Sequence, residues 1–217
     1  MEIAILIYDK LAALDAVGPY EVMRNVPGWD VRFVAEEKGD TRTEDGSLGL
    51  VADHSLDEVS APDILLVPGG KGSRRLMHDE GLLQWLRDVD RTTKWTTSVC
   101  TGSLLLGAAG LLEGKRATGN WLVLEALRQF GADPVGGRWV EDGKVVTAAG
   151  VTAGIDMALH LVALEAGPEV AQAVQLGIEY DPDPPFDSGS PEKAPPEIVE
   201  LVRSVAGAGD PLVSAQD

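Results

Sequence analysis

The single cysteine of the chain, Cys100, lies where a strand-like run changes into a helix-like one. Trp95 to Val99 is rich in β-branched residues, and the small and leucine-rich residues after Cys100 have helical spacing. A side chain at such a corner is lifted out of the sheet, and the first amides of the new helix point towards its sulfur. Because a helix N-terminus favours negative charge, the stretch predicts a nucleophilic thiolate that ionises more readily than an ordinary cysteine.

Two further features are expected at the same edge of the sheet. Asp15 follows the first apolar run, Gly69 and Gly70 end the third, and Cys100 ends the next one. In open α/β sheets the active crevice lies beyond the carboxyl ends of the strands. A carboxyl group, a glycine loop that can offer a backbone amide, and a thiol are therefore expected to converge.

Each of these residues also has a purely structural interpretation. A lone cysteine is usually a small buried hydrophobe, Asp15 can cap its helix, and a glycine pair can be only a turn. His160 stands among leucines and is more typical of a packed core histidine. His54 and His78 lie in polar loop contexts without metal-ligand spacing, so we predict no metal site.

The chain as a whole alternates apolar strand-like runs with helix-like segments. Strands or hairpins are predicted at 2–8, 29–35, 38–60, 63–70, 95–99 and 138–147, and helices after Cys100 and at 15–26, 80–89, 121–130, 152–165, 168–179 and 197–206. The segment 181–196 holds six prolines without periodicity and is predicted to be an ordered wrap or loop. This alternation predicts an α/β fold with a mostly parallel sheet and helices on both faces.

Composition limits the size and partners of the protein. With 217 residues and 44% apolar content, we expect one α/β domain over 1–196, followed by a C-terminal helix and frayed tail over 197–217. A formal charge of -17 argues against nucleic acid and anionic membranes as partners. The apolar stretch from Val145 to Ala166 is interrupted by Asp156 and His160, which argues against a membrane-spanning helix.

The cellular compartment is inferred from two features. One cysteine permits no internal disulfide, which fits a reducing compartment. No basic segment precedes the short apolar run Ile3 to Tyr8, so this run does not have the pattern of a signal peptide. We therefore expect a cytoplasmic protein.

Several motifs together point to one known family. They are the glycine pair at 69–70, the elbow at 98–103, Arg116-Ala-Thr118, the run from Thr147 to Asp156, and the long segment from Glu179 to Lys193. In these motifs the chain resembles the DJ-1/PfpI superfamily, and within it the isocyanide hydratase branch. The resemblance implies a flavodoxin-like three-layer sandwich in a single domain, a homodimer, a small-molecule substrate and no cofactor.

The resemblance also implies roles for three residues. Cys100 would be the nucleophile, Asp15 the carboxyl group bonded to the thiol, and Thr101 the hydroxyl beside it. In the implied reaction Cys100 adds to the terminal carbon of an isocyanide while a protonated Asp15 delivers a proton, giving a thioimidate. The Asp15 carboxylate then activates water, an N-substituted formamide leaves, and the amides of Gly70 and Thr101 hold developing negative charge.

Substrate contacts are expected from Gly69, Gly70, Asn120 and Val151. Relatives of this branch often read Ala-Thr-Thr-His-Trp where this chain reads Ala-Thr-Gly-Asn-Trp at 117–121. We expect this departure to leave more room beside the cysteine and to add a polar amide, so that larger or more polar isocyanides are accepted. The alternative is that Gly119 and Asn120 face solvent or a partner subunit.

Two other functions fit the same residues. In a non-catalytic redox sensor or stress protein, a readily ionised Cys100 would be oxidised to a sulfinate that Asp15 and nearby amides stabilise. In a hydrolase, the thiol would attack another small electrophile. A serine in place of Cys100 would abolish both turnover and sensing, whereas Asp15→Asn would separate a hydratase from a sensor.

Overall fold

A seven-stranded sheet forms the centre of the protein in this computed structural model, which describes residues 1–208 and 211–214. The strand order is β10-β11-β7-β6-β1-β2-β5; β10 pairs antiparallel with β11, and the other neighbouring strands pair in parallel. The strands are β1 (Glu2–Leu6), β2 (Asp30–Ala35), β5 (His54–Ser55), β6 (Ile64–Val67), β7 (Trp95–Val99), β10 (Trp139–Asp142) and β11 (Val145–Ala148).

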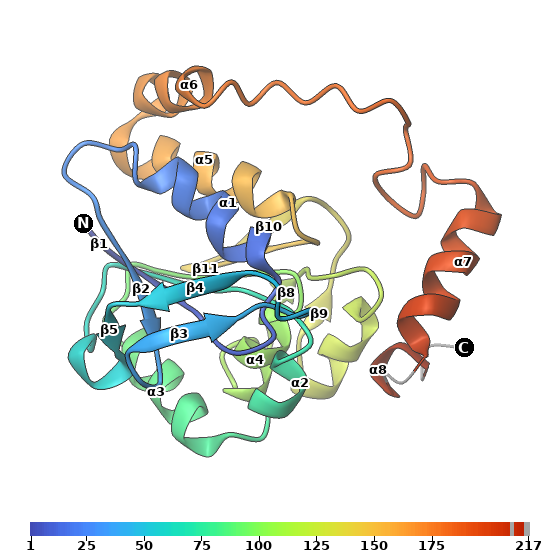
Figure 1. Cartoon of the computed structure of the whole chain (residues 1–217), viewed down its shortest axis with the longest axis horizontal. Helices are drawn as coiled ribbons and strands as arrows, with labels where there is room; N and C mark the ends of the chain where they lie inside the picture. Colours follow the sequence, from blue (N-terminus) through green and yellow to red (C-terminus); the bar gives the residue numbers. More distant parts are fainter. Residues whose placement is uncertain (209–210, 215–217) are drawn as a thin grey trace.

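Helices cover both faces of this sheet (Figure 1). On one face lie α1 (Ala13–Met23) and α5 (Ala153–Ala166), with α6 (Pro168–Gly177) packed against α5. On the other face lie α2 (Ser73–Leu76), α3 (Glu80–Asp90) and α4 (Gly102–Ala108). The predicted α/β class and the flavodoxin-like three-layer sandwich in a single domain are confirmed.

The central strands are apolar because helices cover them from both sides. All four residues of β6 are buried, and so are four of the five residues of β1. A parallel strand covered on both faces is typically a continuous apolar run, which is the pattern that the sequence shows here. Burying each large side chain contributes about 1.5–3 kcal/mol relative to its exposure, so these strands fix the sheet that carries the site.

Short elements differ most from the predictions. The hairpin of β3 (Gly39–Arg42) and β4 (Gly49–Ala52) lies within the predicted region. The predicted helix at 121–130 is a 3₁₀ segment, η2 (Leu124–Phe130), which ends at Gly131 with φ 74°. The elements β5, η1 (Leu56–Glu58), α2, β8 (Arg116–Ala117) and β9 (Asp133–Pro134) were not predicted, because two to four residues show no hydrophobic period.

His160 does not lie in the core. Its side chain is 27% exposed, and Nε2 lies 2.8 Å from Glu141 Oε2 on the neighbouring strand β10. The interpretation of a packed core histidine is therefore wrong, since the ring lies at the surface between a carboxylate and the exposed Trp139, whose ring centre is 5.4 Å away.

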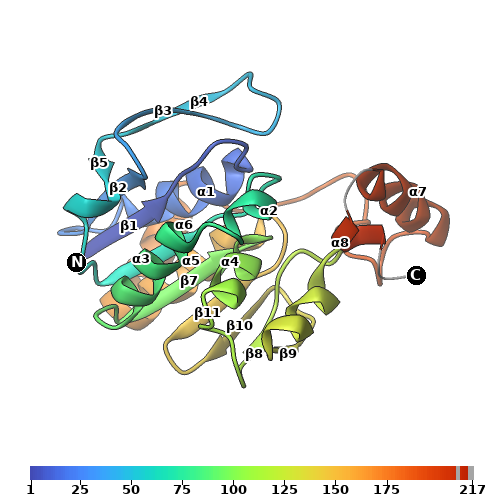
Figure 2. The ribbon, with the colours of Figure 1, turned by 90° about the horizontal axis from the view of Figure 1, so that it is seen from below.

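The C-terminal part leaves the body of the protein. Residues 178–195 run out to α7 (Pro196–Gly207), which is followed by α8 (Pro211–Ser214), and both views show α7 standing beside the sheet and its helices (Figures 1 and 2). None of the residues of α7 is buried, and Arg203 lies 5.2 Å from the ring centre of Trp121. The predicted helix at 197–206 is confirmed, but a domain boundary at 196 stays a prediction.

Part of the predicted frayed tail, residues 209–210 and 215–217, lies outside the described residues. Within the described ranges, no helix has the length and apolar character needed to cross a membrane.

The corner between β7 and α4 requires a glycine two residues after the cysteine. A Cβ on Gly102 would lie 2.0 Å from the carbonyl oxygen of Val67 in β6, a distance at which backbone must move. The helix can therefore begin directly against the neighbouring strand only because residue 102 has no side chain.

We expect Gly102→Ala to lower the free energy of unfolding by about 1–3 kcal/mol, since overpacking against fixed backbone outweighs the gain in helix propensity. Gly177→Ala is the matched control, because no atom lies within 4 Å of a Cβ at Gly177, which is also helical. Urea denaturation followed by circular dichroism measures both changes. If the two variants were equally stable, the close approach at Gly102 would not limit the fold.

Candidate active site

Cys100 lies at the predicted strand-to-helix corner, between β7 and α4. Its φ of 58° is in the left-handed region, which costs a non-glycine residue on the order of 1–3 kcal/mol. Backbone bonds hold this conformation: Cys100 N–H donates to Ala148 O at 3.1 Å and Ala149 O at 3.0 Å, and Cys100 O accepts from Ser103 Oγ at 3.0 Å. The sheet thus fixes a strained elbow at which Cys100 is only 5% exposed.

Asp15 lies in the first turn of α1 and is fully buried. Its Oδ2 accepts from the Gly69 N–H at 2.9 Å. Its Oδ1 is buried and has no N–H or O–H donor in the part of the chain that the structure describes. The N-cap position belongs to Ala12, so the interpretation of Asp15 as a helix cap is wrong. One carboxyl oxygen is anchored, and the other is left for chemistry.

Burial controls the protonation of Asp15. The pKa of this carboxyl is raised from 3.8 to about 7, mainly by desolvation and to a smaller degree by the negative charge of Glu44, while the Gly69 amide and the Cys100 thiol act to lower it. The carboxyl and the thiol therefore act on each other's pKa, while a direct hydrogen bond between them stays a prediction. Near neutral pH the carboxyl is balanced between its two forms.

The thiol has the opposite character from the one predicted. Desolvation and then the charge of Asp15 raise the pKa of Cys100 from 9.0 to about 12, against the lowering effect of the Asn120 side-chain amide and the backbone amides of Thr101 and Val151. The expectation of a readily ionised thiolate is wrong, because burial beside a carboxylate outweighs the favourable end of a seven-residue helix. Above pH 7 the pair holds one proton, which rests on sulfur rather than on Asp15.

The glycine pair anchors side chains on both sides. Gly69 binds Asp15, as described above, and a Cβ at Gly69 would lie 2.5 Å from the Thr101 nitrogen. The Gly70 N–H donates to Thr101 Oγ1 at 2.9 Å. The Gly70 amide is thus already bound, so the expectation that it holds negative charge on a substrate is wrong.

Thr101 and Ser73 form a buried hydroxyl pair under this loop. Ser73 Oγ donates its proton to Gly70 O at 2.7 Å, and it lies within hydrogen-bond distance of Thr101 Oγ1 at 3.0 Å. The Thr101 hydroxyl therefore secures the glycine loop, while its backbone amide bonds the Cys100 sulfur. Sequence reasoning missed Ser73, which lies in a four-residue helix with no periodic signal.

Asn120 lies at the thiol. Its Nδ2 donates to Cys100 Sγ at 3.4 Å, and its Oδ1 accepts from the Leu122 N–H at 3.0 Å. The alternative that Asn120 faces solvent or a partner subunit does not hold. Gly119 adds no space, because a Cβ there would lie 2.4 Å from Ser103 Oγ, so the expectation of extra room at this position is wrong.

Val151 lies just before α5, and its backbone amide lowers the pKa of the Cys100 thiol. Its φ of 24° is unusual for a β-branched residue. Cys100 therefore has three N–H neighbours: those of Thr101, Val151 and Asn120. This arrangement can stabilise negative charge on sulfur when a reaction creates it.

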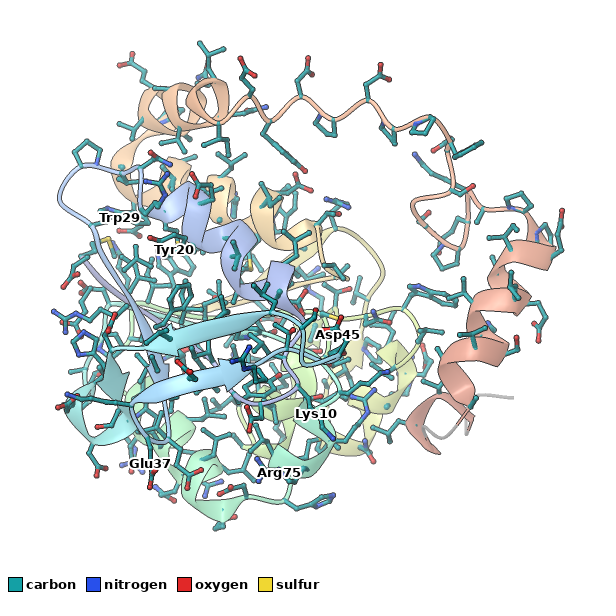
Figure 3. The ribbon with its side chains drawn as sticks, viewed as in Figure 1. Lys10, Tyr20, Trp29, Glu37, Asp45 and Arg75 are labelled. Carbon is teal, nitrogen blue, oxygen red and sulfur yellow. The ribbon has the colours of Figure 1, made fainter. Side chains whose placement is uncertain are left out.

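Two cavities are found in the body of the protein, and neither is lined by Cys100 or Asp15. One of about 380 Å³ separates Leu11–Ala13 from the Thr43–Leu48 hairpin loop, whose Asp45 is labelled in Figure 3. A larger one of about 570 Å³ is lined by residues that include Tyr8, and by Glu37 and Arg75, also labelled there, but Cys100 is not among its lining residues. Within the described ranges no group of His, Cys, Asp and Glu side chains has the arrangement of a metal site.

Sequence comparisons relate the chain to one family of known proteins. Residues 1–164 match the DJ-1/PfpI family. The chain is 43% identical over 206 residues to the isonitrile hydratase of Pseudomonas putida, covering 95% of this chain and 90% of that one. It is 37% identical over 129 residues to the HTH-type transcriptional regulator CdhR of Pseudomonas aeruginosa, which covers 58% of this chain but 38% of the regulator.

Solved structures include a close match as well. The crystal structure of a ThiJ/PfpI family protein from Pseudomonas syringae superposes with a TM-score of 0.91 at 37% identity, covering 98% of this chain and 90% of that one. The sequence match over most of the chain and the shared fold lead to one conclusion. This chain belongs to the DJ-1/PfpI family.

Proposed function

We propose that the protein is an isocyanide hydratase, which converts an isocyanide and water into an N-substituted formamide. The observation that carries the proposal is the buried pair of Cys100 and Asp15, in which one carboxyl oxygen is anchored by Gly69 and the other has no N–H or O–H donor in the described part of the chain. The similarity to the Pseudomonas putida isonitrile hydratase supports the substrate class.

The first step forms a covalent adduct. Asp15, ionised above pH 7, takes the proton from the Cys100 thiol while sulfur bonds to the terminal isocyanide carbon. The same carboxyl then gives this proton to that carbon. The S–H bond breaks, S–C and C–H bonds form, and the product is a thioimidate with Asp15 again ionised.

The second step adds water and releases the product. Asp15 takes a proton from water as oxygen bonds to the thioimidate carbon, and it delivers a proton to nitrogen. The C–S bond of this adduct then breaks, the hydroxyl proton returns through Asp15 to sulfur, and the N-substituted formamide leaves. The N–H groups of Asn120, Thr101 and Val151 stabilise the charge on sulfur as this bond breaks.

The protonated thiol also bears on the redox-sensor alternative. Oxidation to sulfenic and sulfinic acids follows thiolate character and exposure, whereas Cys100 is 5% exposed with a raised pKa. These properties favour catalysis over sensing.

The homodimer implied by the family resemblance and the cytoplasmic location stay predictions.

Purified protein is expected to convert a simple alkyl or aryl isocyanide to its formamide. Absorbance, or proton NMR of the formyl group, measures the formation of this product. Cys100→Ser should abolish turnover, because a hydroxyl is a far weaker nucleophile here. Asp15→Asn should lower kcat by about 10²- to 10⁴-fold, since the amide keeps the shape but transfers no proton. Asp53→Asn, an exposed position away from the site, is the matched control. Full turnover by Asp15→Asn would exclude the mechanism.

The rate should rise with pH through the pKa of Asp15. Below about 7 the carboxyl is protonated and cannot accept the thiol proton, so kcat/KM falls tenfold for each pH unit. Above about 7 the rate should reach a plateau up to pH 9, because the thiol loses its proton only near 12. Initial rates from pH 5 to 9, corrected for uncatalysed hydrolysis, measure this profile. A flat profile across pH 7 would contradict the assignment of Asp15 as base.

Asp15→Asn should also make the protein more stable at high pH. A carboxyl whose pKa is raised in the fold stabilises the fold fully below its unfolded pKa of 3.8, and this contribution is lost as pH rises through about 7. The shift corresponds to at most roughly 4 kcal/mol. Thermal unfolding should therefore give a variant Tm above that of the wild type at pH 8, with the difference shrinking towards pH 5. If the difference in Tm between variant and wild type were equal at pH 5 and pH 8, the buried charge of Asp15 would not lower the stability of the fold.

A further inference from the structure

Tyr8 is a buried titratable residue that the proposed reaction does not use. It lies just after β1, is 8% exposed, and donates its hydroxyl proton to Pro68 O at 2.7 Å. Burial, together with the charges of Asp15 and Cys100, raises the pKa of the phenol well above 10. Tyr8 therefore stays protonated at all pH values at which the site works, and it acts towards Pro68 only as a donor.

The acceptor of this bond belongs to the peptide group that holds Asp15. The Pro68 carbonyl and the Gly69 N–H are the two ends of one planar peptide unit. The N–H end donates to Asp15 Oδ2 at 2.9 Å, while the C=O end accepts from Tyr8. A carbonyl that accepts a hydrogen bond makes its own N–H a stronger donor, because hydrogen bonds in a chain polarise one another.

The surroundings leave this peptide unit little freedom. Next to it, Gly69 O accepts from the Ala12 N–H at 2.9 Å, and a Cβ at Gly69 would lie 2.9 Å from Asp15 Oδ2. The Tyr8 ring lies close to Gly72, where a Cβ would lie 3.0 Å from Tyr8 Cδ2. The phenol is thus held in place by packing, and its hydroxyl adds a directed polar contact.

We propose that Tyr8 is a positioning residue for the Cys100–Asp15 pair: its hydroxyl holds and polarises the Pro68–Gly69 peptide group, whose amide binds the Asp15 carboxyl. For catalysis this inference rests on the proposed function, but the contact itself does not. A stronger amide donor favours the ionised carboxyl, the form that accepts the thiol proton.

The other side chains that shift the pKa of Asp15 remain when only the Tyr8 hydroxyl is removed. They are the Cys100 thiol at the elbow and the charged Glu44 in the hairpin loop. Arg74 of α2 acts on Tyr8 by charge. In Tyr8→Phe all three groups stay in the chain, so a change in Asp15 titration reports the loss of the hydroxyl.

The test follows Asp15 directly by ¹³C NMR of protein labelled at the aspartate carboxyl carbon. The Asp15 resonance is the one that titrates near pH 7 and disappears in Asp15→Asn. Tyr8→Phe should move this titration to higher pH by on the order of half a pH unit, with the acid limb of kcat/KM moving equally. Tyr20→Phe is the matched control, because it removes the same atom from a ring that stacks on Phe33 (Figure 3).

A second variant tests the opposite direction if Tyr8→Phe does not fold. Incorporation of 3,5-difluorotyrosine at position 8 keeps the ring and makes the hydroxyl a stronger donor, so the Asp15 titration should move to lower pH. An Asp15 titration that stays in place in the folded Tyr8 variants would overturn the proposal. Absence of isocyanide turnover in the wild type would contradict the proposed function and leave the NMR result decisive for Tyr8.

Discussion

The structure depends on placing a carboxyl group and a thiol together away from water. Desolvation is the first cause of both pKa shifts, and it makes the two groups share a proton that each would otherwise release independently. Such a pair is costly unless hydrogen bonds satisfy it. The N–H of Gly69 meets the carboxyl, and the amides of Thr101, Val151 and Asn120 meet the thiol.

The sheet supplies the rigidity that this arrangement needs. Cys100 is held at φ 58° because its N–H bonds the end of β11 on one side and its carbonyl accepts from Ser103 on the other. Glycines stand where backbone approaches backbone, as at Gly102 against Val67. Parallel strands β6 and β7 end side by side, so the glycine loop and the elbow meet without a long connection.

The raised pKa of Cys100 changes how the site has to work. A thiolate at rest would react with many electrophiles and oxidants, whereas a protonated thiol reacts only when Asp15 takes its proton. The nucleophile is then generated at the same moment as the acid that protonates the substrate carbon. The Thr101 and Ser73 hydroxyls contribute indirectly, since they hold the glycine loop rather than the substrate.

The sequence by itself determined the longer strands, the long helices, the elbow and the meeting of Asp15, Gly69 and Cys100, because hydrophobic period and chain order decide which strand ends share an edge. Short elements such as α2, and with it Ser73, carry no such period. Only the tertiary structure decided the protonation of Cys100, the binding of the Gly70 amide by Thr101, and the contact between Asn120 and sulfur. These properties depend on burial and on atoms far apart in the chain, which local pattern does not encode.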